Sequence, residues 1–215
     1  MTYLEIVNNV LRRMREEEVS SVQNTTFSKM VGDFVNDSKR LVETAWDWSG
    51  LKTTLVVPTV SGTVTYSLTD SKDKIKTLSV LNDTSNVFME YRPSDWFNEK
   101  YYNAEELSGT PQYYTFSGLD ANKDTQVDVY PKPDGVYSLR FNCVLRNSDL
   151  VNDTDELDIP YLPVMHMAVA LLARERGETG GTSVPEYFGI ADRYLSDAVA
   201  LDANKHPDEL VWYTP

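Results

Sequence analysis

The sequence predicts an α+β protein: a four-helix bundle built from both ends of the chain, an inserted antiparallel β domain resembling a sandwich or barrel, and a C-terminal tail. Three observations predict this class. Apolar residues recur at helical spacing near both ends, the period changes to two between them, and an apolar tail follows a clear helix stop. The expected parts are residues 1–50 and 158–206 (the two bundle halves), 51–157 (the β domain) and 207–215 (a docking tail).

Length and composition favour a protein that folds without covalent cross-links. The 215 residues and 41% hydrophobic content are enough for a substantial core. The single cysteine, Cys143, cannot form an internal disulfide, and we find neither a signal-peptide pattern nor an apolar run of about 18 residues. We expect synthesis and folding in a reducing cytoplasm, without membrane association.

The chain is strongly acidic. Twenty basic residues stand against 33 acidic ones, so the formal net charge is −13. This charge disfavours nonspecific binding to a phosphate backbone, which argues against a reader of nucleic acid. The acidity serves solubility, or it keeps the surface from adhering to DNA that passes close by.

The first predicted helix opens with a capping box. Thr2 and Glu5 have the spacing at which each side chain caps the other's backbone, and apolar positions continue to about Glu17. Glu16–Glu18 are three adjacent carboxylates, but consecutive residues fan around a helix and cannot converge on one ion. We interpret them as a solvated helix end.

The longest amphipathic pattern covers Thr26–Trp48, a helix of roughly 34 Å that needs partners for its apolar face. Thr25 or Thr26 can cap its start, and Gly50 follows its end. Lys39 and Glu43 are assigned to the polar face. The apolar face is predicted from Phe27, Met30, Val31, Phe34, Leu41, Val42 and Ala45.

From Leu51 the period is two, and Thr, Val and Tyr are frequent between short turns. About seven short strands indicate a sandwich or a small barrel. Residues Ser94–Glu106 interrupt them as a short helix or structured loop over one edge. The candidate strands are Thr53–Val57, Thr63–Leu68, Lys76–Leu81, Val87–Tyr91, Gln112–Ser117, Gln126–Tyr130 and Val136–Leu145.

The helical period returns in the last third of the chain. A third helix opens at Pro160 and ends at Gly177, which suits a left-handed C-cap. A second capping box, Ser183 with Glu186, opens a fourth helix that stops at His206–Pro207. The glycine-rich link between these helices lacks the Lys-Ser/Thr pair of a phosphate-binding loop, so we interpret it as a connection.

The candidate metal and catalytic motifs each lack residues that the site would require. The segment Asp120–Thr125 begins like an EF-hand loop, but Thr125 and Pro131 stand where glycine and a bidentate glutamate are needed. An Asx-rich turn is the better interpretation. His166 is predicted to be a packed or rim histidine, and Cys143 a small hydrophobe in a strand. We therefore predict no enzyme activity, no catalytic residue, no cofactor and no metal.

The β region is rich in aromatic residues, which leaves an alternative function open. They form either a platform for a carbohydrate or another receptor, or the packing of a helix–sheet junction or subunit contact. A cell-wall hydrolase with two acidic residues is a weaker third hypothesis because no carboxylate pair stands out. The aromatic residues are Trp96, Phe97, Tyr101, Tyr102, Tyr113 and Tyr114.

The C-terminal tail carries four apolar residues after the last helix stop: Leu210, Val211, Trp212 and Tyr213. Leaving them in water is unfavourable unless the tail docks. It can dock on its own domain or insert into a neighbouring subunit or another protein, and we favour insertion. These four residues are the predicted partner-binding site.

Several stretches resemble the head-to-tail adaptor (connector) proteins of tailed bacteriophages. They are Thr2–Met14, Phe34–Asp37 continuing to Ala45–Trp48, Gly109–Thr115 and Val129–Pro133. The resemblance covers nearly the whole chain and is greatest to the tail tubular protein A type of short-tailed phages.

The resemblance implies a structural virion protein at the head–tail junction, assembled in the host cytoplasm. It implies a dodecameric ring below the portal protein that extends the DNA channel, without sequence-specific DNA binding, and supports the tail nozzle protein and sometimes tail fibres. It also implies that the C-terminal tail, here Leu210–Tyr213, engages the portal.

Overall fold

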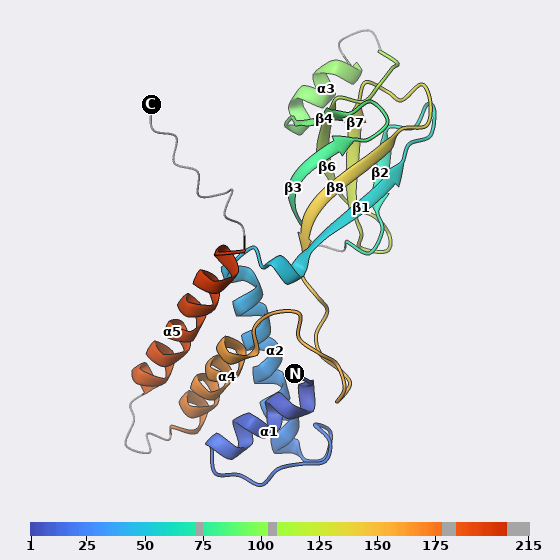
Figure 1. The fold of residues 1–215 in the computed structure, drawn as a ribbon. Helices are drawn as coiled ribbons and strands as arrows, with labels where there is room; N and C mark the ends of the chain where they lie inside the picture. The colour runs from blue at the N-terminus through green and yellow to red at the C-terminus, as the bar shows by residue number, and fades with distance from the viewer. Residues whose placement is uncertain (72–74, 103–106, 178–183, 206–215) are drawn as a thin grey trace, which may run out of the picture. The chain divides into compact units, whose positions relative to one another are not determined.

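The computed structural model describes residues 1–71, 75–102, 107–177 and 184–205, and it confirms the α+β class (Figure 1). The chain divides into two compact units. We call Met1–Leu51 with Ser148–Pro215 the helical unit, and Lys52–Asn147 the β unit. Residues 148–157 thus lie in the helical unit. The more specific architectures, a four-helix bundle and a β-sandwich, remain predictions.

Helix α1, Tyr3–Arg13, begins with the predicted capping box. The Thr2 hydroxyl accepts from the Glu5 amide at 3.3 Å, and the Glu5 carboxylate accepts from the Thr2 amide at 2.9 Å. The helix ends before the predicted Glu17 because Arg15 takes a left-handed conformation, with φ of 59°. The position carries no glycine, so the sequence gives no stop signal there.

Helix α2, Thr26–Ala45, is capped by Thr25 and is shorter than predicted. Trp46 is extended, and the chain turns back so that the buried Trp48 indole donates to the Val42 carbonyl at 2.7 Å. A 3₁₀ turn, η1, follows at Ser49–Leu51. Its Gly50 is required by close approach rather than as a helix cap, because a Cβ there would lie 2.3 Å from the Asp158 carbonyl oxygen.

The buried face of α2 differs from the predicted one. Lys39 and Glu43, assigned to the polar face, are buried and form an ion pair of 2.9 Å, while Leu41 is exposed. The Lys39 ammonium also donates to the Ser148 carbonyl at 3.0 Å. The assignment was wrong because the segment after the last strand returns along this side of α2, and it supplies a polar partner that periodicity cannot reveal.

Helices α4, Tyr161–Arg176, and α5, Val184–Ala203, complete the helical unit. Gly177 caps α4 in the left-handed conformation, as predicted. Ser183, the first residue of the second predicted capping box, lies outside the described residues. Helix α4 packs against α1, α2 and α5, so it is the central element of this unit (Figure 1).

The β unit contains two four-stranded sheets, and each of the seven predicted strands is present with its ends displaced by two residues at most. The pairs are antiparallel except the parallel pair β5–β6. The first sheet is ordered β1 (Lys52–Pro58), β8 (Ser138–Leu145), β3 (Ile75–Asn82), β4 (Val87–Phe88). The second is ordered β2 (Thr65–Leu68), β7 (Thr125–Tyr130), β6 (Tyr113–Leu119), β5 (Glu90–Tyr91).

One predicted strand, Val87–Tyr91, is divided between the two sheets. The amide of the buried Met89 donates to the Val80 carbonyl in the first sheet, and the next amide, of Glu90, donates to Gln112 beside the second. Both sheets contribute to one apolar core. Its buried members are Tyr66, Leu68, Val80, Met89, Tyr114, Val127, Val129, Leu139 and Phe141.

Candidate partner interface

Helix α5 carries a stripe of exposed apolar side chains. Ile190, Tyr194 and Leu201 are separated by four and seven residues, so they lie on one side of the helix. All three are exposed, and Leu201 keeps 70% of its surface in water. We call these three residues the α5 stripe. Apolar side chains aligned in this way are typical of a surface that another chain covers.

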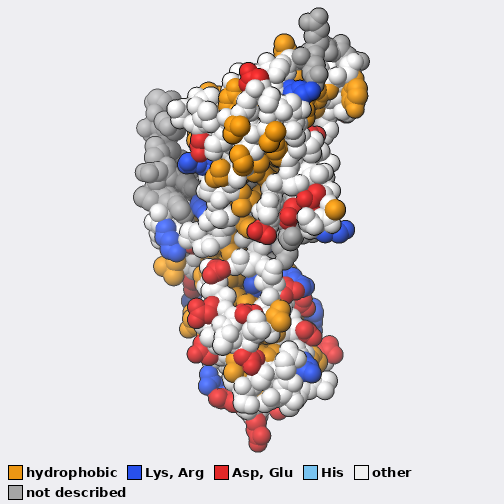
Figure 2. All heavy atoms as spheres, turned by 90° about the vertical axis from the view of Figure 1, so that its right-hand side faces the viewer, with side chains coloured by type: hydrophobic (Ala, Val, Ile, Leu, Met, Phe, Trp, Pro, Cys, Tyr) orange, Lys and Arg blue, Asp and Glu red, His pale blue; other side chains and the backbone are white. Residues whose placement is uncertain are grey.

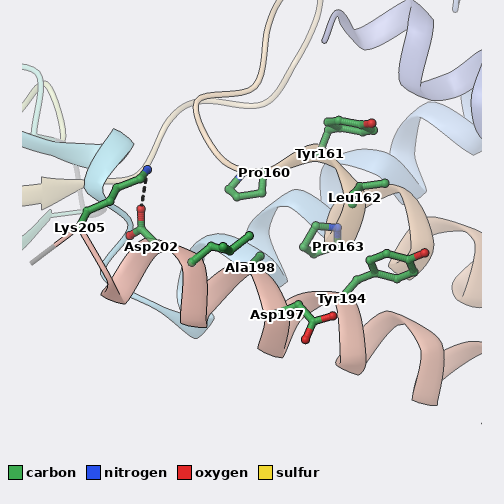
Figure 3. Close-up of a pocket in the computed structure, with 10 residues that line it drawn as sticks. Pro160, Tyr161, Leu162, Pro163, Tyr194, Asp197, Ala198, Asp202 and Lys205 are labelled. Atoms are coloured by element: carbon green, nitrogen blue, oxygen red, sulfur yellow. Dashed lines mark hydrogen bonds and ion pairs between the residues drawn. The ribbon is translucent and has the colours of Figure 1, made fainter.

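The stripe borders a groove of about 460 Å³ between the start of α4 and the end of α5. Figure 3 shows Pro160 and Pro163 from the α4 side lying toward α5, with Tyr194 and Ala198 opposite them. The lining is mainly apolar, which suits an apolar segment of another element. The lining residues are Pro160, Tyr161, Leu162, Pro163, Tyr194, Asp197, Ala198, Leu201, Asp202 and Lys205.

One end of the groove is fixed by a buried carboxylate, Asp202. It accepts from the Ser49 amide at 2.9 Å and hydroxyl at 2.5 Å, from the Trp46 indole at 3.2 Å, and from the Lys205 ammonium at 3.0 Å. Burial raises the pKa of Asp202, but the hydrogen bonds from Ser49 and Lys205 outweigh it and lower the pKa to about 2. The ionised carboxylate thus holds the end of α5 on the turn after α2.

Tyr194 is held in place by the histidine that the sequence singles out. The rings of Tyr194 and His166 stack with centroids 4.2 Å apart and planes 8° from parallel. Burial, and then the charge of Arg13, lower the pKa of His166. His166 is half-buried, so the prediction of a packed or rim histidine is confirmed.

The predicted site residues Leu210, Val211, Trp212 and Tyr213 lie outside the described residues. The description ends at Lys205, which itself lines the groove. Sequence reasoning missed the groove because its two sides come from segments about 30 residues apart that share no motif. The spacing of Ile190, Tyr194 and Leu201 places them on one side of a helix, but it does not indicate that this side is exposed.

Two carboxylates of the acidic run Glu16–Glu18 form ion pairs with arginines. Glu16 lies 2.6 Å from Arg176, and Glu18 lies 2.8 Å from Arg12. The run follows α1 rather than ending it, so the reason given for its failure to bind metal was wrong. In the described parts of the chain, no three metal-ligating side chains gather.

The Asp120 loop uses its carboxylate internally. The Asp120 carboxylate accepts from the amides of Asn122 at 2.8 Å and Asp124 at 2.9 Å, which is the predicted Asx-type turn. Cys143 is buried on β8, as predicted. Of the helices described, none combines the length and apolar character needed to cross a bilayer.

Most of the aromatic residues singled out in the β unit pack at a junction between a helix and a sheet, whereas Tyr102 keeps 83% of its surface exposed. Helix α3, Ser94–Tyr102, places Trp96 4.9 Å from Tyr113 and 5.3 Å from Tyr130, measured between ring centroids. Arg92 and Lys100 lie over the Trp96 ring, at 6.0 and 5.5 Å. This packing favours a structural role over the carbohydrate- or receptor-binding platform.

Apolar side chains also gather on one face of the β unit (Figure 2). Val60 and Val136 are two strongly exposed apolar residues of the β unit. They adjoin residues joined by a 2.8 Å hydrogen bond from the Thr59 amide to the Tyr137 carbonyl, so they lie at the same end of the β1–β8 pair. This end offers a second, separate contact surface.

A family model described as SU10 adaptor protein matches residues 1–209. No protein with curated annotation matches the chain.

Proposed function

The chain belongs to the SU10 adaptor protein family, and we propose that it is a subunit of a ring that lies between the portal and the tail nozzle of a phage. The family consists of phage head–tail adaptors, so the chain has a structural role in the virion and associates with other head and tail proteins. We infer that the ring is a dodecamer assembled in the host cytoplasm, and that its subunit is of the tail tubular protein A type.

The observation that carries the proposal is the α5 stripe. A subunit that works alone gains nothing from aligning Ile190, Tyr194 and Leu201 in water, whereas a ring subunit covers such a surface with its neighbour. In a head-to-tail ring the stripe of one subunit meets a different, complementary surface of the next subunit, and the ring closes when the rotation at each contact divides a full turn.

The net charge supports a lumen through which DNA passes. At −13 per chain, a ring of these subunits repels the phosphate backbone rather than binding it. DNA in such a channel encounters no sequence-specific contact.

The remaining surfaces are assigned to the other partners. The apolar tail residues, Leu210–Tyr213, enter the portal. The exposed end of the β unit with Val60 and Val136 contacts the tail nozzle and, where fibres are present, supports them.

The test is the native mass of the purified protein, alone and after mixing with portal rings from the same phage. We expect a portal complex that carries a full ring of this chain. Truncation after Glu209 should abolish portal binding with unchanged circular dichroism, whereas removal of only Thr214 and Pro215 should not. Portal binding of full affinity by the longer truncation would contradict the tail assignment.

A second pair of variants tests the stripe. Ile190→Asp should prevent the ring from closing, because a carboxylate is buried at the contact between subunits. Asp192→Asn changes an exposed residue of the same helix and should leave assembly intact. A ring that forms equally well from both variants would remove α5 from the subunit contact.

A further inference from the structure

We propose that, in the free subunit, the groove between α4 and α5 binds the chain's own C-terminal segment, Leu210–Tyr213. This inference goes beyond the adaptor role, because it concerns the subunit before it meets any partner. It states where the apolar tail is held, and which contact a partner must replace to engage it.

Reach is the first argument. Lys205 lines the groove and is the last residue described. The four residues 206–209 separate it from Leu210, and the five steps from Lys205 to Leu210 span at most about 18 Å. Along α5, the groove extends from Lys205 back to Tyr194, which is roughly 16 Å at the helical rise per residue. A tail that reverses after Pro207 can therefore lie along the whole groove.

Chemistry is the second argument. The groove offers proline rings, Leu162 and Ala198 on its walls, together with the exposed side chain of Leu201. The tail offers leucine, valine, tryptophan and tyrosine in sequence. Each of the two aromatic residues can bury about 150–250 Å². The groove and the tail are both apolar, so contact between them removes apolar surface of each from water.

Local concentration decides between the chain's own tail and that of a second copy. A short flexible linker holds a tethered segment at an effective concentration in the millimolar range. A free subunit at micromolar concentration meets another copy's tail far less often. Residues 206–209 tether the tail to Lys205, which lines the groove, so the chain's own tail occupies the groove first.

Disulfide trapping tests the contact. In a Cys143→Ser background we would combine Thr214→Cys with Asp197→Cys, since Asp197 lines the groove. The matched control combines Thr214→Cys with Asp192→Cys, an exposed position on the opposite side of α5 that the tail can also reach. Mild oxidation of dilute protein should form the intramolecular disulfide at least 10-fold faster in the Asp197 pair. Equal rates, or disulfides between chains alone, would overturn the proposal.

A protease experiment tests the groove without new cysteines. Leu201→Asp introduces a charge at an exposed lining position and should release the tail, so that chymotrypsin cleaves at Trp212 and Tyr213 several-fold faster. Ser196→Asp lies on the same helix, is also exposed, and belongs neither to the groove lining nor to the α5 stripe, so it should leave the rate unchanged. Unchanged cleavage in Leu201→Asp would contradict the proposal.

Both measurements use the free chain and need no portal. If the chain forms no ring or does not bind the portal, the disulfide and protease results can still be interpreted. If these two experiments give a negative result, the adaptor role is unaffected.

Discussion

Helices α4 and α5 are neighbours with similar apolar content, but they are buried to opposite extents. Ten of the 16 residues of α4 are buried, against three of the 20 residues of α5. Helix α4 has α1 and α2 on other sides, whereas the main neighbour of α5 within the described chain is α4. Apolar content sets how much surface a helix must cover, and the described chain itself covers that surface for α4 but not for α5.

The difference in burial implies that α4 contributes mainly to folding and α5 mainly to assembly. Side chains of α4 stabilise the subunit, because their burial is complete in the single chain. Exposed side chains of α5 contribute little to the subunit and become buried when a partner, or the tail, covers them. Substitutions in the two helices should therefore affect different measurements.

The largest expected effect is on stability, from a matched pair of leucines. Leu172→Ala on α4 removes a fully buried side chain and should lower the free energy of unfolding by about 2–5 kcal/mol. Leu201→Ala on α5 removes one that is 70% exposed and should change it by less than about 0.5 kcal/mol. Urea unfolding followed by far-ultraviolet circular dichroism measures both. Equal losses would show that α5 is as much a core helix as α4.

An intermediate effect is expected where α5 is attached. Asp202→Asn removes a carboxylate whose pKa is about 2, against an ordinary value near 3.8. Because the folded pKa is the lower one, ionised Asp202 contributes about 2 kcal/mol above pH 4, and this is lost as the pH falls toward 2. Trp46 and Trp48 fluorescence in urea, at pH 7 and pH 3, reports on this region. The variant should unfold more easily at pH 7 and should differ less from the parent at pH 3.

A parent and variant with the same difference at both pH values would show that the charge of Asp202 is not what holds α5. The hydrogen bonds to Ser49 would then act through geometry alone.

The smallest effect is expected at the stacked ring pair between the two helices. Burial and the Arg13 charge lower the pKa of His166 below 6.5, so the neutral ring is favoured in the folded state. Stability is therefore full above pH 6.5 and declines as the pH falls below that value. NMR titration should show one histidine with a pKa under 6.5, absent in His166→Phe. A value at or above 6.5 for that signal would mean that the ring against Tyr194 is solvated.

The sequence was sufficient for most elements, but not for their ends. Alternation located every strand, because one face of each sheet is buried in a common core. Helix ends were less predictable. Arg15 stops α1 without glycine, and the Trp48 indole closes the last turn of α2, and both depend on how the chain folds back.

The candidate interface was predictable only in part. The spacing of the α5 stripe can be read from the sequence, but its exposure cannot, because exposure depends on where α1 and α2 pack. The Asp202–Ser49 contact joins residues 153 positions apart, and no local pattern announces it. The tail residues were chosen from sequence alone, and they remain a prediction.

The β unit begins and ends at one place on its own surface. Lys52, its first residue, pairs across β1 and β8 with Val144, near its last. Residues paired in antiparallel strands have Cα atoms about 5 Å apart. The two boundaries of this unit therefore lie close together in space. Insertion, exchange or deletion of a whole domain is tolerated best in this arrangement. A helical unit whose two insertion points are adjacent can accept a different β domain without changes to its own core.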